Sequence, residues 1–177
     1  MPHIRYFKKK LFIENTSVIN IAKKNKTPFY LYSRKQIEEN YINFAKIFEN
    51  VNPLICFAAK ANTNMTIMRI LGKLGSGADV VSGGELLKAL KAGIKPDKIV
   101  FSGVGKTEEE LKLAIKNKIL LINVESESEA ILINKIGGKI NQAISIGFRI
   151  NPNVDAKTHK KISTGKAENK FGISIKN

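Results

Sequence analysis

The chain repeats one local signal, a hydroxyl side chain followed three residues later by Glu or Gln. In this capping box the hydroxyl accepts a hydrogen bond from a backbone N–H at the start of a helix, and the acid or amide reaches back to the cap residue. Four copies at expected loop-to-helix junctions predict a chain of alternating strands and helices. They are Ser33–Gln36, Ser82–Glu85, Thr107–Glu110 and Ser126–Glu129.

Short apolar runs occur between these signals, about 20 to 25 residues apart. Amphipathic stretches such as Glu85–Ala92 and Glu108–Lys116 follow the runs, and glycines at positions 72, 75, 93, 137 and 138 are expected to end helices. Units this compact predict a parallel sheet with helices outside it. The expected strands are Leu54–Ala59, Ala78–Val81, Ile99–Phe101, Ile119–Val124 and Ala143–Ile150.

Two parallel folds compete, an open doubly wound sheet and a closed (β/α)8 barrel. The dinucleotide-binding and P-loop glycine patterns are missing, and Gly103–Thr107 reads as an ordinary turn. Polar residues recur at nearly every strand end, which suits the loop-built face of a barrel. A whole barrel needs ~250 residues, so we predict a partial (β/α)8 TIM-type barrel of about five βα units. The polar strand-end residues are Lys60, Asn62, Asp79, Ser82, Ser102, Asn123, Glu125, Arg149 and Asn151.

Residues 1–33 do not follow this rhythm. Pro28–Tyr32 is rich in aromatic and apolar residues and is predicted to be a strand. We expect residues 1–33 to belong to a separate β-domain and residues 34–177 to form the incomplete barrel.

The net charge of +15 raises the question of nucleic-acid binding. Only four of the 30 basic residues are arginine, whose forked guanidinium is favoured for reading bases. The lysines are scattered, and no aromatic residues interleave with them to form a stacking surface. We therefore expect nonspecific affinity for polyanions at low salt and no specific nucleic-acid partner.

Compartment is indicated by three weak signals. No apolar run approaches the ~20 residues that cross a bilayer. Lys8–Lys10 is followed only by Leu11–Ile13, too short for a signal peptide. The single cysteine, Cys56, cannot form an internal disulfide. A cytoplasmic protein without membrane contact is expected.

Lys60 is the candidate nucleophile, because it closes the apolar run Leu54–Lys60 at the end where α/β folds assemble their chemistry. Partial desolvation there would favour the neutral amine that a Schiff base requires. The alternative is that Lys60 is one more solvated lysine.

Several longer segments resemble one family. Thr27–Tyr32 (TPFYLY), Phe57–Asn62 (FAAKAN), Ala78–Leu86 (ADVVSGGEL), Asn123–Ser126 (NVES) and a run from Arg149 (RINPNVD) to Gly172 (KFG) occur in the order found in diaminopimelate decarboxylases. The chain resembles the N-terminal part of that family over nearly all its length. The last run distinguishes it from relatives acting on ornithine or arginine, and from alanine racemases and small pyridoxal-phosphate carriers, which share the barrel.

The resemblance implies a pyridoxal 5′-phosphate enzyme with a barrel and a separate β-domain, active as a homodimer with shared active sites. Lys60 matches the Schiff-base lysine, and the implied reaction converts meso-2,6-diaminopimelate, an amino-acid substrate, to L-lysine in the last step of lysine biosynthesis. Asp79 and Arg149 match positions near the cofactor. From the residues alone, a carboxylate and a guanidinium at adjacent strand ends would hold a lysine or phenolic oxygen; the alternative is a structural Asp79–Arg149 ion pair.

Other candidates are expected to be structural. Glu85 matches a family position but is explained by its capping box, Cys56 should be a core residue, His3 should be solvated, and His159 should shape its loop. No metal-ligand spacing occurs, so no metal is expected.

Two readings within the fold stay open: another pyridoxal-phosphate-dependent decarboxylase of basic amino acids, or a non-catalytic carrier of the cofactor. The family's glycine-rich phosphate loop and the acid that pairs with the pyridine nitrogen have no counterpart here. We therefore expect the 177 residues alone to be inactive. The two edge strands of an incomplete barrel would have unpaired backbone groups, so we also expect the chain to be prone to aggregate.

Overall fold

The computed structural model describes residues 3–154 and 172–174. Contacts divide the chain into two compact units, Met1–Pro53 and Leu54–Asn177, and each is described by itself. The expected boundary after residue 33 stays a prediction.

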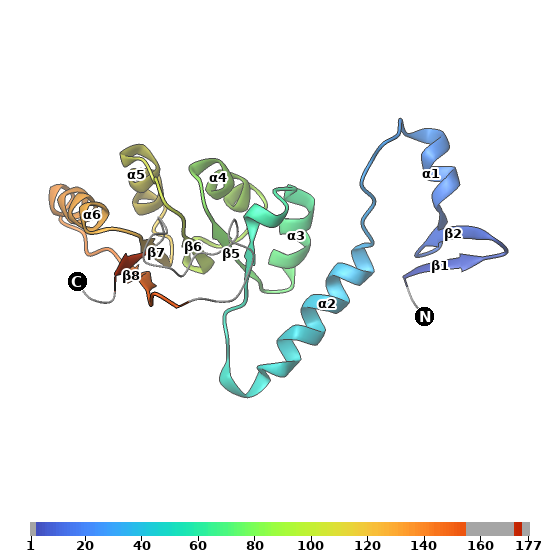
Figure 1. Cartoon of the computed structure of the whole chain (residues 1–177), viewed down its shortest axis with the longest axis horizontal. Coiled ribbons are helices and arrows are strands. Elements are labelled where there is room, and N and C mark those ends of the chain that lie inside the picture. Colours follow the sequence, from blue (N-terminus) through green and yellow to red (C-terminus); the bar gives the residue numbers. More distant parts are fainter. Residues whose placement is uncertain (1–2, 155–171, 175–177) are drawn as a thin grey trace. The chain divides into compact units, whose positions relative to one another are not determined.

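The second unit is built on a five-stranded sheet whose strands follow chain order, β4-β5-β6-β7-β8, and all pair in parallel. Helices α3 to α6 all lie on one side of this sheet (Figure 1). A doubly wound sheet reverses its strand order at a switch point, whereas a barrel does not. The partial barrel predicted from the sequence is therefore confirmed. The strands are β4 (Cys56–Ala58), β5 (Gly77–Val80), β6 (Ile99–Phe101), β7 (Leu121–Val124) and β8 (Ile146–Phe148), and the helices are α3 (Met65–Lys73), α4 (Gly83–Lys91), α5 (Glu108–Lys116) and α6 (Glu127–Lys139).

All five predicted strands are present, most of them one to three residues shorter at an end than predicted. The last predicted strand is divided, because Ile150–Asn151 (β9) leaves the main sheet and pairs in parallel with Ile173–Ser174 (β10). Two single turns, η2 (Ala59–Ala61) and η3 (Pro96–Lys98), complete the described part of this unit. The glycines at 72, 137 and 138 lie inside helices rather than after them.

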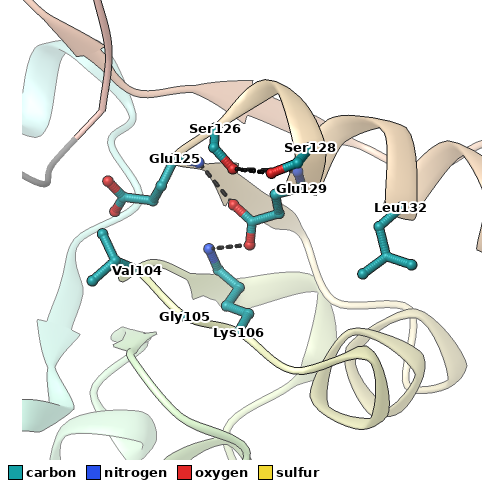
Figure 2. A pocket seen from close by; sticks show the side chains of 8 residues that line it. All are labelled: Val104, Gly105, Lys106, Glu125, Ser126, Ser128, Glu129 and Leu132. Carbon is teal, nitrogen blue, oxygen red and sulfur yellow. Dashed lines mark hydrogen bonds and ion pairs between the residues drawn. The ribbon is translucent and has the colours of Figure 1, made fainter.

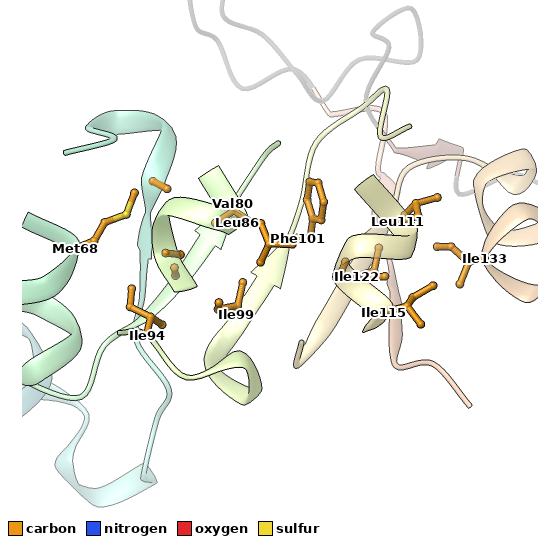
Figure 3. Close-up of a cluster of buried hydrophobic side chains, with 14 of the residues drawn as sticks. Met68, Val80, Leu86, Ile94, Ile99, Phe101, Leu111, Ile115, Ile122 and Ile133 are labelled. Carbon is orange, nitrogen blue, oxygen red and sulfur yellow. The ribbon is translucent and has the colours of Figure 1, made fainter. Parts of the chain in front are cut away.

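The core of this unit lies between the sheet and its helices (Figure 3). Strand residues such as Val80, Phe101 and Ile122 are fully buried, and helix residues such as Leu86 and Leu111 pack on them. Burial of apolar surface on this scale is the main force holding the helices on the sheet.

All four predicted helix caps form their first half, the hydroxyl accepting from the backbone N–H three residues on. Only Thr107–Glu110 completes the box, with the Glu110 carboxylate accepting from the Thr107 N–H at 3.0 Å. The carboxylates of Glu85 and Glu129 instead accept from the residue before the cap, the N–H groups of Val81 and Glu125. The four signals therefore predicted the helix starts correctly. In the helices that begin after Ser82 and Ser126, however, the Glu carboxylate bonds to the residue before the cap and not to the cap itself.

The first unit contains a three-stranded antiparallel sheet, β1 (Ile4–Phe7), β2 (Lys10–Ile13) and β3 (Thr16–Ser17). It also contains α1 (Val18–Lys24), α2 (Arg34–Ile47) and the turn η1 (Glu49–Val51). The prediction of a strand at Pro28–Tyr32 is wrong, since the segment is neither helix nor strand. An extended segment becomes a strand only when a partner strand satisfies its backbone groups, and Pro28–Tyr32 pairs with none of the described strands. Its Tyr30 is 89% exposed.

In the part of the chain that the structure describes, no helix has the length and apolarity needed to span a membrane.

Leu86 and Leu87, adjacent in α4, give a matched test of the core. Leu86 is fully buried, whereas Leu87 is 44% exposed. Leu86→Ala is expected to lower the free energy of unfolding by about 2–5 kcal/mol, and Leu87→Ala by less than about 1 kcal/mol. Urea unfolding followed by circular dichroism measures both; equal losses would contradict the assigned packing.

Glu110 predicts a pH dependence of stability. Its carboxylate accepts from the Gly83 N–H at 2.6 Å as well as from Thr107, and these backbone hydrogen bonds lower its pKa below the ordinary value. A lowered folded-state pKa stabilises the fold above the unfolded-state pKa, and the stabilisation is lost as pH falls through the folded-state value. Glu110→Gln should cost about 1 kcal/mol at pH 7 and progressively less toward pH 3.

The control is Glu109→Gln, which removes the same charge from a side chain that makes no hydrogen bond with the described residues. Urea midpoints between pH 3 and 7 should separate the two variants at neutral pH and bring them together in acid. A constant gap across that range would rule out the Glu110 assignment.

Candidate active site

The carboxyl ends of the parallel strands border a cleft of about 640 Å³. Small-molecule sites typically occupy about 300–1,000 Å³. The cleft brings together the three site residues predicted from the sequence: Lys60 just after β4, Asp79 in β5 and Arg149 directly after β8. Its lining is Lys60, Asp79, Val81, Ser102, Gly103, Val104, Asn123, Glu125 and Arg149.

Lys60 stands on the single turn η2 directly after β4. The preceding Ala59 is fully buried and anchors the turn, whereas Lys60 is exposed. Its amine forms no hydrogen bond or ion pair with any residue that the structure describes. The expected desolvation of Lys60 is therefore wrong for the described chain, because the strand ends two residues before the lysine.

Asp79, the third residue of β5, is oriented by a relay of polar side chains. Its Oδ1 accepts a hydrogen bond from Ser102 Oγ at 2.6 Å, and Ser102 Oγ accepts from Asn123 Nδ2 at 3.0 Å. The relay crosses from β5 past β6 to β7. It fixes one oxygen of Asp79 and leaves the other without a hydrogen bond to the described residues.

Arg149 follows β8 and pairs with Glu125, not with Asp79. The Arg149 Nη1 to Glu125 Oε1 distance is 2.9 Å, and the Glu125 side chain is only 4% exposed. Glu125 Oε1 also accepts from the Gly103 N–H at 3.2 Å, and its Oε2 accepts from the Gly172 N–H at 3.0 Å. The proposed Asp79–Arg149 ion pair is wrong because their strands are not adjacent: β6 and β7 lie between β5 and β8.

Sequence reasoning missed Glu125 as a site residue, although it was among the polar strand-end positions. Asn123 and Glu125 alternate with the buried Ile122 and Val124, so a period of two could have placed both on the cleft side. Which of them pairs with a cation depends on the neighbouring strand, and sequence spacing does not give that.

Lys106 was also missed, since Gly103–Thr107 reads as a turn. It borders a second hollow of about 370 Å³ beside the cleft, together with Glu125, Ser126 and Glu129 (Figure 2). Its ammonium lies 2.8 Å from Glu129 Oε1 and its side chain is only 1% exposed.

The remaining candidates have mixed outcomes. Glu85 is buried and accepts from the Val81 N–H. It therefore stabilises the start of its helix, as expected, although its partner is the residue before the cap. Cys56 is partly buried in β4, and burial raises the pKa of its thiol. His3 is not solvated as predicted; it lies 2.7 Å from Glu39 and its side chain is 12% exposed. His159 lies outside the described residues, as does most of the run from Arg149 to Gly172.

Within residues 3–154 and 172–174, no group of three or more His, Cys, Asp or Glu side chains could hold a metal ion.

Known proteins place this geometry in a family. Residues 34–177 match the model described as pyridoxal-dependent decarboxylase, pyridoxal binding domain. The chain is 47% identical to the diaminopimelate decarboxylase of Aquifex aeolicus over 99% of its length and 41% of that protein. It is 53% identical to that of Helicobacter pylori strain J99 over 85% of its length and 37% of that protein. The chain thus spans about two fifths of the length of these curated relatives.

Solved structures agree. A diaminopimelate decarboxylase from M. jannaschii matches with a TM-score of 0.89 and 42% identity, covering 98% of this chain and 42% of that one. The Helicobacter pylori enzyme complexed with L-lysine matches with a TM-score of 0.86 and 49% identity, covering 89% of this chain and 40% of that one. An arginine decarboxylase of Paramecium bursaria Chlorella virus, at 23% identity and a TM-score of 0.71 over 90% of this chain and 40% of that one, shares the fold alone.

The expected cofactor class and the expected resemblance to diaminopimelate decarboxylases are therefore confirmed. Matched over residues 34–177, with a lysine-bearing cleft at the strand ends, the chain belongs to the pyridoxal-dependent decarboxylase family through its pyridoxal-binding domain.

Proposed function

We propose that this chain is the cofactor-binding barrel portion of a diaminopimelate decarboxylase, which converts meso-2,6-diaminopimelate to L-lysine. The observation that carries the proposal is one cleft, lined by Lys60, Asp79 and Arg149, in a chain 44–53% identical to curated diaminopimelate decarboxylases.

The described residues fit pyridoxal phosphate. The Lys60 amine is exposed and unengaged by the described residues, so it is accessible to an aldehyde. The cleft has the volume of a small-molecule site and mixes a carboxylate, a guanidinium, a hydroxyl and an amide. When bound, pyridoxal phosphate supplies an electron sink for the electron pair that a departing carboxylate leaves behind.

The roles of the side chains follow from their contacts. Lys60 would hold the cofactor at its aldehyde carbon through the amine, and the same nitrogen, when free, would hold or return a proton. Asp79 keeps one oxygen on Ser102 and presents the other to a cation or hydroxyl in the cleft. Arg149, held by buried Glu125, would offer positive charge to an anionic group such as a substrate carboxylate.

Assembly and location are further parts of the proposal. The family resemblance supports a homodimer with shared active sites, and the single cysteine suits the reducing cytoplasm. Decarboxylation of other basic amino acids is a weaker alternative, because the arginine decarboxylase match supports the fold alone.

A chimera makes the activity measurable. In it, this chain replaces the matching 41% of the Aquifex aeolicus relative. We expect the chimera to release carbon dioxide from meso-2,6-diaminopimelate and to prefer it over ornithine or arginine. The 177 residues alone are expected to give no measurable rate. Activity of the chimera on arginine alone would favour the alternative substrate class, and activity of the lone chain would refute the expected dependence on the rest of the enzyme.

Lys60→Ala in the chimera should abolish the visible absorbance band of the bound cofactor and lower kcat by at least about 10²–10⁴-fold, because the amine both binds the cofactor and moves protons. Lys91→Ala, which removes an exposed lysine of α4, is the control and should leave both unchanged. A persisting absorbance band in Lys60→Ala would move the attachment point to another lysine. A wild-type chimera that takes up cofactor without decarboxylating any amino acid would favour a carrier.

A further inference from the structure

Lys106 is a buried cation with a complete set of partners. Its ammonium donates to the carbonyl oxygens of Gly103 and Asn123, each at 2.7 Å, and to Glu129 Oε1 at 2.8 Å. Figure 2 shows its amine directed at Glu129, which comes from the first turn of α6. The ion pair is almost fully removed from water.

Stability alone is a poor explanation for such a pair. Desolvating two charges costs several kcal/mol per ion, and replacing a buried ion pair by well-packed apolar side chains is often neutral or stabilising. Buried ionic groups are better explained where they fix one geometry among several. Lys106 does tie two neighbouring strand ends together, because Gly103 follows β6, whereas Asn123 lies in β7 and Glu129 lies in the first turn of α6.

Both of these strand ends form hydrogen bonds with Glu125. Gly103 accepts from Lys106 through its carbonyl oxygen, and its N–H donates to Glu125 Oε1. Gly103 has a φ of 95°, which glycine adopts freely. The N–H of Glu125 itself donates to the second oxygen of Glu129, at 2.8 Å. Lys106 and Glu129 therefore constrain Glu125 at both its backbone and its carboxylate.

We propose that Lys106 and Glu129 are positioning residues of the cleft: they fix the carboxylate of Glu125, and through it the guanidinium of Arg149, on the cleft wall. The consequence for substrate rests on the proposed function, in which Arg149 meets an anionic group. Neither Lys106 nor Glu129 lines the main cleft, so both act through the residues that they hold, of which Glu125 is the one that contacts Arg149.

The chain offers a matched control pair. Lys112 and Glu108 form an ion pair at 2.7 Å between the same residue types, but within α5, exposed and away from the cleft. The test protein, called the 106/129 variant, combines Lys106→Met and Glu129→Met. The control protein, called the 112/108 variant, combines Lys112→Met and Glu108→Met. Both double variants leave the net charge unchanged.

The first measurement is amide hydrogen exchange in the full chain, read at Gly103. The substitutions do not alter the donor or the acceptor of this hydrogen bond, so protection at Gly103 reports whether its N–H and the Glu125 carboxylate stay together when Lys106 no longer holds the Gly103 carbonyl. We expect exchange at Gly103 at least about tenfold faster in the 106/129 variant and unchanged in the 112/108 variant. The Ser102 N–H, bonded to the Val80 carbonyl within the sheet, is the internal reference. Unchanged protection at Gly103 would overturn the proposal whether or not the chain binds a cofactor.

The second measurement is a double-mutant cycle in the chimera with Arg149→Met. If the pair acts through Arg149, the 106/129 variant should raise KM for diaminopimelate about tenfold with the wild-type arginine and have no further effect in the Arg149→Met background. Additive effects would show a merely structural role and overturn the inference. A wild-type chimera without activity would defeat the proposed function and leave the exchange result standing as the test of positioning.

If the 106/129 variant does not fold, Lys106→Met with Glu129→Gln replaces it in both measurements. This variant keeps an acceptor oxygen for the Glu125 N–H while removing both charges. Faster exchange at Gly103 is again expected, and wild-type protection again refutes the proposal.

Discussion

Carboxylates bonded to backbone N–H groups hold the loop face of this half-barrel together. In a parallel sheet every strand runs into a loop and then into a helix whose first N–H groups lack partners. The cap hydroxyls of Ser82, Thr107 and Ser126 satisfy one such donor each. Glu85, Glu110 and Glu129, in the first turns of the same helices, accept from N–H groups at the cap or one residue before it. Glu110 also accepts from the N–H of Gly83, at the start of α4, and Glu125 accepts from the N–H of Gly103, after β6. Successive loops are thereby linked by charge-assisted hydrogen bonds, which are stronger than neutral ones.

This linkage divides the cleft wall into two parts with different electrostatic character. The side formed by β5, β6 and β7 carries a relay from Asp79 through Ser102 to Asn123, with one charge and two neutral groups. The other side carries the charged pair of Arg149 and buried Glu125. Lys60 belongs to neither network, since none of the described residues engages its amine. The walls are preorganised, while the amine is left to be engaged by whatever enters the cleft.

The local features of this architecture were predictable from the sequence, and the pairwise ones were not. Apolar runs and helix caps depend on neighbouring residues, so the strands, the helix starts and the clustering of Lys60, Asp79 and Arg149 followed from pattern. The partner of Arg149 depends on which strand lies beside β8, and spacing alone does not identify Glu125. Pro28–Tyr32 has the composition of a strand, but strand formation requires a second segment. The burial of Lys106 likewise depends on Asn123 and Glu129, which lie 17 and 23 residues further along the chain.

The sequential strand order has a consequence for how the sheet is made. Each strand from β5 to β8 pairs with the strand that precedes it in the chain, so each pairing closes only a short loop of polypeptide. Short closures carry a smaller entropic cost than long ones. During synthesis each new strand can dock on an edge that already exists, with no need to wait for a distant segment. During synthesis the sheet is therefore extended at one edge only, the edge formed by the strand that was made last.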